Sequence, residues 1–120
     1  MSTDYRDLIA WQRAMNLIVT VYGVTRSFPA DERFGLTNQL RRAVVSIASN
    51  IAEGQGRQSV KDFVRFLRIA NGSRQEVETQ LFAANELGFA SDDELSTAFS
   101  QSEEVGRLVA GLIRSLLTRN

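Results

Sequence analysis

The chain has 120 residues, a length that fits one domain, and we predict that this domain spans residues 1–120. It lacks cysteine and histidine, which excludes disulfides, zinc sites built on those residues, and Ser-His or Cys-His nucleophile pairs. Its 14 basic and 14 acidic side chains cancel, and a neutral composition disfavours general nucleic-acid binding. There is no signal-peptide core and no apolar run of about 18 residues, so we expect a cytoplasmic protein without a membrane segment.

The first predicted helix covers residues 5–27 and carries two apolar series instead of one. Steps of three and four residues keep each series on one helix face, and the two faces lie roughly 100° apart. A helix of a monomer usually shows a single apolar stripe, so we predict that one series packs into the core and the other contacts another subunit. The alternative is one wide core face. The predicted subunit seam, which includes two off-line residues of the third helix, consists of Leu17, Val21, Val24, Phe66 and Ile69.

The second and third helices are predicted over residues 34–53 and 59–87. Gly54 suits the left-handed residue that often stands just past a helix end. A glycine-serine pair interrupts the middle of the third helix, where glycine costs about 1 kcal/mol relative to alanine. We interpret this pair, Gly72 and Ser73, as a point of close helix packing. The alternative is a local kink or a break.

Capping residues mark the ends of the last two helices. Ser59 is the expected N-cap of the third helix, Gly88 its stop, and Ser91 the N-cap of a fourth helix that continues to the end of the chain. Three acidic residues follow Ser91 and complement the helix dipole. Four long helices, short connections and no strand signal predict an all-α fold, an antiparallel up-down-up-down four-helix bundle.

Polar side chains flank the apolar line of the second helix. Ser46 and Asn50 are four residues apart and share one helix face. Partly buried polar groups need partners, because an unsatisfied one costs about 1–3 kcal/mol. A hydrolase that uses Ser46 and Glu53 is disfavoured because no base accompanies them, and we predict no catalytic residue, no metal and no cofactor. The predicted structural polar seam consists of Arg42, Ser46, Asn50, Glu53 and Glu76.

Charge is unevenly distributed along the chain. Residues 33–74 contain eight basic and two acidic side chains, whereas residues 75–104 contain eight acidic and no basic ones. Antiparallel helices would place these charges at opposite ends of the bundle. We interpret the basic end as a possible docking face for RNA or for an acidic protein; the alternative is solvated charge without a partner. The candidate residues of this face are Arg57, Lys61, Arg65 and Arg68.

Three segments carry a family resemblance: "WQRAM", "FPADERFGLTNQLRRAVVSIASNIAEGQGR" and "FVRFLRIANGSRQEVETQL". They resemble the bacterial four-helix-bundle family named for proteins encoded in intervening sequences of 23S ribosomal RNA genes, over residues 5–88. The family also includes the accessory variability determinant protein of diversity-generating retroelements. The resemblance implies a bundle that assembles as a ring of five identical subunits. It also implies that one basic relative works with a reverse transcriptase and nucleic acid.

Two functions follow as hypotheses. The leading one is a non-enzymatic homo-oligomeric scaffold or adaptor, a cyclic pentamer whose partners are its own copies and an unidentified protein. The alternative is a nucleic-acid-binding accessory protein that works with a reverse transcriptase, for which a salt-dependent interaction with structured RNA is expected.

Overall fold

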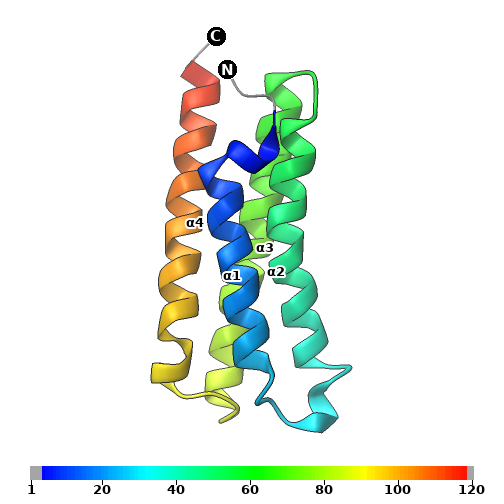
Figure 1. Ribbon diagram of the computed structural model, residues 1–120, viewed down its shortest axis with the longest axis vertical. Helices are drawn as coiled ribbons and strands as arrows, with labels where there is room; N and C mark the ends of the chain where they lie inside the picture. The colour runs from blue at the N-terminus through cyan, green and yellow to red at the C-terminus, as the bar shows by residue number, and fades with distance from the viewer. Residues whose placement is uncertain (1–3, 119–120) are drawn as a thin grey trace.

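The structure, a computed structural model, describes residues 4–118 as four long α-helices in which consecutive helices run in opposite directions (Figure 1). It contains no strand within these residues, which confirms the all-α prediction with four helices. Short 3₁₀ turns precede the first two helices. The elements in chain order are η1 (Tyr5–Asp7), α1 (Ile9–Thr25), η2 (Ala30–Glu32), α2 (Leu36–Gln55), α3 (Val60–Glu86) and α4 (Asp92–Thr118).

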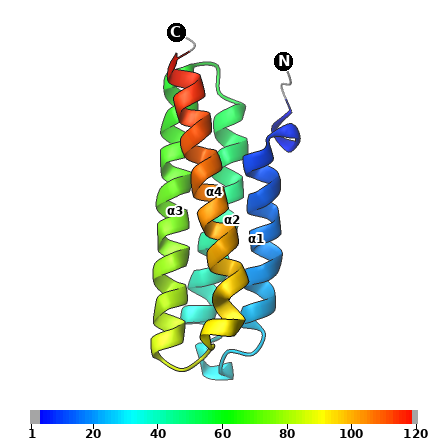
Figure 2. The same cartoon turned by 90° about the vertical axis from the view of Figure 1, so that its left-hand side faces the viewer.

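Each helix packs against two neighbours, so the four helices close into a rod of 48 × 24 × 19 Å. α1 contacts α2 and α4, and α3 contacts the same two helices from the other side. The start of α1, the α2–α3 turn and the end of α4 lie at one end of the rod (Figures 1 and 2). The α1–α2 and α3–α4 turns lie at the opposite end. This alternation decides which charges of the sequence meet at each end.

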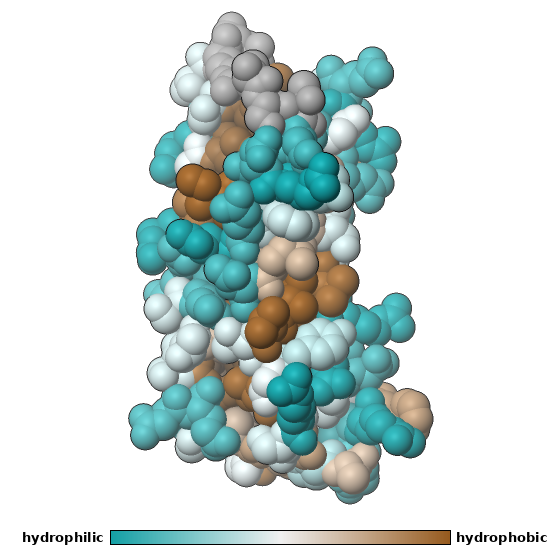
Figure 3. Space-filling model, viewed as in Figure 1, coloured by the Kyte–Doolittle hydropathy of each residue, from teal (hydrophilic) through white to brown (hydrophobic). Residues whose placement is uncertain are grey.

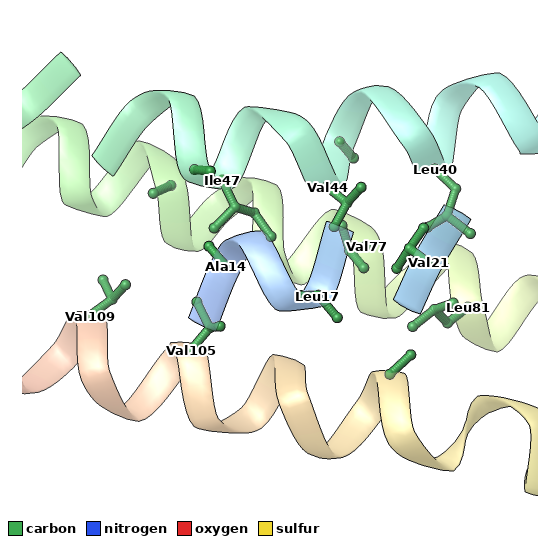
Figure 4. Close-up of a cluster of buried hydrophobic side chains, with 14 of the residues drawn as sticks. Ala14, Leu17, Val21, Leu40, Val44, Ile47, Val77, Leu81, Val105 and Val109 are labelled. Atoms are coloured by element: carbon green, nitrogen blue, oxygen red, sulfur yellow. The ribbon is translucent and has the colours of Figure 1, made fainter. Parts of the chain in front are cut away.

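Burial in the core shows which of the two predicted apolar series of α1 faces the other helices. It also shows that part of the predicted subunit seam is wrong. Leu17 and Val21 are fully buried inside the chain's own bundle, and Figure 4 shows them in the cluster of apolar side chains enclosed by the four helices. Phe66 is also buried, and Val24 packs partly buried against the core. Of the predicted seam only Ile69 keeps a large exposed area, with 42% of its surface accessible. The apolar series of α1 that includes Leu17 and Val21 therefore faces the core, and the prediction was wrong for Leu17, Val21 and Phe66.

Two helix ends differ from prediction for local reasons. α1 begins at Ile9 because Leu8 has extended backbone (ψ 123°), while Asp4 caps the separate turn η1 by accepting from the Arg6 backbone N–H at 2.9 Å. α2 runs through Gly54 to Gln55, so Gly54 is not a left-handed end residue. Within the described residues, positive φ occurs only at Gly88 (77°), the predicted stop of α3.

The point of close packing between α2 and α3 is Gly54, and not Gly72. A Cβ atom at Gly54 would lie 2.7 Å from the Cβ of Phe66 and 3.1 Å from the ring of Phe63, so the absent side chain lets α2 and α3 approach. A Cβ at Gly72 would meet nothing within 4 Å, because this residue lies on the exposed side of α3. Ser73 is buried beside it. The prediction of close packing was therefore wrong for Gly72.

Both predicted serine caps are present. The Ser59 hydroxyl accepts from the Asp62 backbone N–H at 3.1 Å at the start of α3. At the start of α4, the Ser91 hydroxyl accepts from the Glu94 N–H at 3.2 Å, and the Glu94 carboxylate accepts from the Ser91 N–H at 2.9 Å. This reciprocal pair is a capping box and satisfies two backbone donors that the helix leaves free.

Candidate functional site

Hydrogen bonds link α2 to α3 at the predicted polar seam. The hydroxyls of Ser46 and Ser73 share a hydrogen bond of 3.0 Å between the two helices. The Asn50 side-chain amide donates to the Ser46 hydroxyl at 3.0 Å and to the Ser46 carbonyl at 2.9 Å. The structure therefore joins three residues that the sequence analysis singled out, and every polar contact among them is neutral.

The charged residues of the predicted seam do not join this cluster. The Glu53 carboxylate instead accepts from the Arg57 side chain at 2.7 Å, an exposed contact between the last turn of α2 and the turn that follows it. Arg42 and Glu76 line a polar groove between α2 and α3, but they form no ion pair within residues 4–118. In the same groove, the Oε1 atom of Gln80 is buried without a hydrogen-bond partner. The groove is lined by Asn38, Gln39, Arg42, Ala43, Ser46, Glu76 and Gln80.

A second polar network, between α3 and α4, was not predicted. Arg74 donates to Glu78 one turn later at 2.7 Å, and the fully buried Ser102 hydroxyl donates to the same Glu78 oxygen at 2.7 Å. Gly106 makes room for this arginine, because a Cβ there would lie 2.7 Å from the Arg74 Cζ atom. The available signal was Ser102 itself, which falls on the apolar line of its helix among Ala98 and Val105.

The predicted basic face is assembled at the end of the rod where α3 begins. Arg57 and Arg65 both lie over the ring of Phe66, with the guanidinium carbon 4.6 Å from the ring centroid in each case. Such cation–π contacts hold two cations beside one buried aromatic ring. Lys61 and Arg68 are exposed on the same helix, and neither they nor Arg65 form an ion pair within the described residues.

An exposed hydrophobic surface lies along α1 and α2 and is called the α1–α2 face below. Figure 3 shows it in brown near the middle of the molecule. Val19 has 73% of its surface accessible, and Met15 and Val45 have 39% each. A groove in this face is lined by Tyr5, Trp11, Met15, Ile18, Val45, Ala48, Ser49 and Ala52. Trp11, Met15 and Ile18 of this groove belong to one of the two apolar series predicted for this helix, but the subunit contact was assigned to the other series.

Two carboxylates at element starts have lowered pKa values. The Arg6 side chain donates to Asp4 and holds the pKa of that carboxyl at about 2. The backbone N–H of Ser91, and then its hydroxyl, lower the pKa of Glu94. The hydrogen bonds that lower these two pKa values stabilise the ionised carboxylates at the caps of η1 and α4. Both carboxylates lie outside the polar seam and the basic face.

The geometry restricts the chemistry that the described residues can perform. The Ser46 hydroxyl faces an amide donor and another hydroxyl, and neither group is a base that would activate it. No three Asp or Glu side chains within residues 4–118 gather closely enough to hold a metal ion. None of the described helices is both long and apolar enough to cross a membrane.

Comparisons with known proteins agree with this fold. Among solved structures, the chain is similar to a protein of unknown function from the S23 ribosomal protein family of Bacteroides thetaiotaomicron VPI-5482, with a TM-score of 0.78 and 22% sequence identity. The alignment covers 88% of this chain and 98% of the other, and at this identity it shows the fold alone. A search of curated proteins finds no match. Residues 6–111 match the model of the 23S rRNA-intervening sequence protein, and the chain therefore belongs to that family.

Proposed function

We propose that this protein is a cytoplasmic, non-enzymatic scaffold made of five identical chains that associate through the α1–α2 face. The observation that supports the proposal is the exposure of large apolar side chains on this face, led by Val19 at 73%. Contiguous apolar surface on a soluble protein marks a place where another molecule binds. Burial of such surface stabilises an assembly by roughly 25 cal/mol per Å².

The occupant of this face is a second copy of the chain. Residues 14–25 of α1 contain no charged side chain and none lines the groove of this face, so its centre offers nothing for a charged partner to pair with. The nearby Arg41 lies over the Tyr22 ring, outside the groove. An apolar surface of this kind is best covered by another uncharged apolar surface, and every copy carries one. The number five comes from the family resemblance, in which the subunits form a closed ring.

The polar seam supports a structural role instead of a catalytic one. Ser46, Asn50 and Ser73 bond to one another and fix the pairing of α2 with α3. Acyl transfer needs a nucleophile, a base and donors for the developing oxyanion, all within reach of one another. The seam supplies a hydroxyl and donors without the base, so we assign it to helix register.

Replacement of Val19 by glutamate tests the proposal. A charge at this exposed position leaves the bundle's own core untouched but opposes burial against another copy. At high salt we expect Val19→Glu to sediment as a single folded chain, with the helical circular dichroism of the wild type. The control Ser100→Glu places the same charge on an exposed site of α4 and should leave the assembly intact. An unchanged assembly in Val19→Glu would contradict the proposed interface.

The alternative, an RNA-binding accessory protein, is favoured by one observation: Lys61, Arg65 and Arg68 are basic and form no ion pair within the described residues. Fluorescence anisotropy of a structured RNA at low and high salt measures this directly. The scaffold proposal predicts no binding. Salt-dependent binding that disappears when these three residues become alanine would establish the alternative instead.

A further inference from the structure

The two ends of the bundle carry opposite charge. The end where α3 begins holds five basic side chains on the α2–α3 turn, α3 and α4, against Glu53, which is already paired with Arg57, and Asp62. The segment before α1 adds Arg6, Asp4 and Asp7 at the same end, which stays net basic. The opposite end holds six acidic side chains, against Arg26 and Arg33. The basic set is Arg57, Lys61, Arg65, Arg68 and Arg114, and the acidic set is Asp31, Glu32, Glu86, Asp92, Asp93 and Glu94.

The basic end also contains an apolar groove between the first turns of α3 and the last turn of α4, named here the basic-end groove. Its apolar lining, called its floor below, consists of the buried Val64, the half-buried Val60 and the exposed Leu117. The cations Lys61, Arg65 and Arg68 line its rim. Figure 2 shows these two helix ends side by side. A groove with this floor and rim fits an apolar side chain that is flanked by carboxylates.

The opposite end of the same chain presents such a side chain. Leu87 ends α3 with 61% of its surface accessible, in the turn that leads to α4. Glu86 precedes it and Asp93 lies in the first turn of α4, and neither forms an ion pair within the described residues. Asp92 and Glu94 are engaged locally, since they accept from Asn85 and Ser91.

We propose that the basic-end groove binds the α3–α4 turn of a second copy of this chain, with Leu87 on the apolar floor and Glu86 and Asp93 at the cationic rim. The apolar floor favours a protein segment over an RNA backbone, whose phosphates need cations alone. The contact joins two different surfaces, so copies associate head to tail. This contact uses different residues from the α1–α2 face, so the two contacts can be tested independently.

The contact depends on charge at an exposed surface, so salt weakens it. The Debye length falls from about 10 Å at 0.1 M salt to about 3 Å at 1 M, which screens the pairs between Lys61 or Arg65 and the partner's carboxylates. The apolar contact of Leu87 remains, but one leucine in a shallow groove holds two chains weakly. We therefore expect association at low salt and dissociation at high salt.

Two charge-reversed variants test the proposal by sedimentation velocity at low salt. The first carries Lys61→Glu and Arg65→Glu, and the second carries Glu86→Lys and Asp93→Lys, both in the Val19→Glu background that blocks the α1–α2 face. Each variant keeps one intact end. We expect the background protein to form head-to-tail chains and each variant alone to stay a single chain. Their equimolar mixture should associate again, because each intact end meets its intact counterpart and each reversed end meets a reversed one.

Matched controls separate this contact from a general effect of charge. Arg42→Glu with Arg107→Glu makes the same change in net charge at exposed sites outside both ends, and should associate like the background. A mixture of the two end variants that remains single chains overturns the proposal. Binding of a structured RNA by the background protein, lost in the first variant while no mixed complex forms, also overturns it. If Val19→Glu itself remains a five-chain ring, the α1–α2 face fails, while the mixed complex still tests this contact.

Discussion

Single glycines set the distance between helices in this bundle, and their positions make a matched pair of substitutions informative. Gly54→Ala puts a methyl group 2.7 Å from the Cβ of Phe66, so α2 and α3 must separate. We expect it to lower the free energy of unfolding by about 1–3 kcal/mol. Gly72→Ala meets no atom of the chain and should raise it by about 0.5–1 kcal/mol through helix propensity.

Urea denaturation followed by circular dichroism measures both glycine variants. The opposite order of stability would contradict the assigned close approach. A loss for Gly72→Ala that grows with protein concentration would show that a neighbouring copy packs at this exposed site.

The pH dependence of stability has a residue-level component at Glu94. Its pKa is lowered in the folded chain because the Ser91 backbone and hydroxyl donate to the carboxylate, so its contribution is present above the ordinary value of 4.5. That contribution is lost as pH falls through the lower, folded pKa. We expect Glu94→Gln to melt below the wild type at pH 7 and to converge with it at strongly acidic pH. A difference in Tm that is the same at both pH values would contradict this.

At the scale of the helices, the pairing of α3 with α4 depends on the partly buried network of Arg74, Glu78 and Ser102. Ser102→Ala removes a donor to the Glu78 carboxylate, and we expect a loss of about 1–3 kcal/mol in unfolding free energy. A double-mutant cycle with Glu78→Gln should show that the two changes are not additive. Strict additivity would mean that the 2.7 Å contact contributes nothing to stability.

The helices could be predicted because their signals are local. Apolar steps of three and four residues, the serines that cap α3 and α4, and the left-handed Gly88 all act within a few residues. The start of α1 could not be predicted in the same way. Asp4 and Arg6 form a local turn there that competes with the helix, although the apolar periodicity continues through it.

The candidate sites were predictable only where one helix determines them. Ser46 and Asn50 share a face by spacing alone, and the structure joins them. Which apolar series of α1 faces the core depends instead on how α2, α3 and α4 surround it, and Leu17 shows that the choice was wrong. The Ser102 network needs the register of α4 against α3, which sequence spacing does not give.

At the scale of the whole molecule, the neutral chain presents an uncharged apolar face along α1 and α2 and opposite charges at its two ends. The first feature favours association of copies side by side, and the second favours association end to end. These two modes differ in their response to salt, because the side-by-side contact buries apolar surface and the end-to-end contact pairs exposed charges. High salt should therefore separate copies that are joined end to end, while each ring of copies joined side by side stays intact.

Static light scattering on the purified chain at high salt, where only the side-by-side contact persists, tests the central claim most directly. We expect a particle with the mass of five 13.4 kDa chains that persists on dilution. A folded, soluble particle of 13.4 kDa at high protein concentration would contradict it, because the exposed α1–α2 face would then have no partner copy.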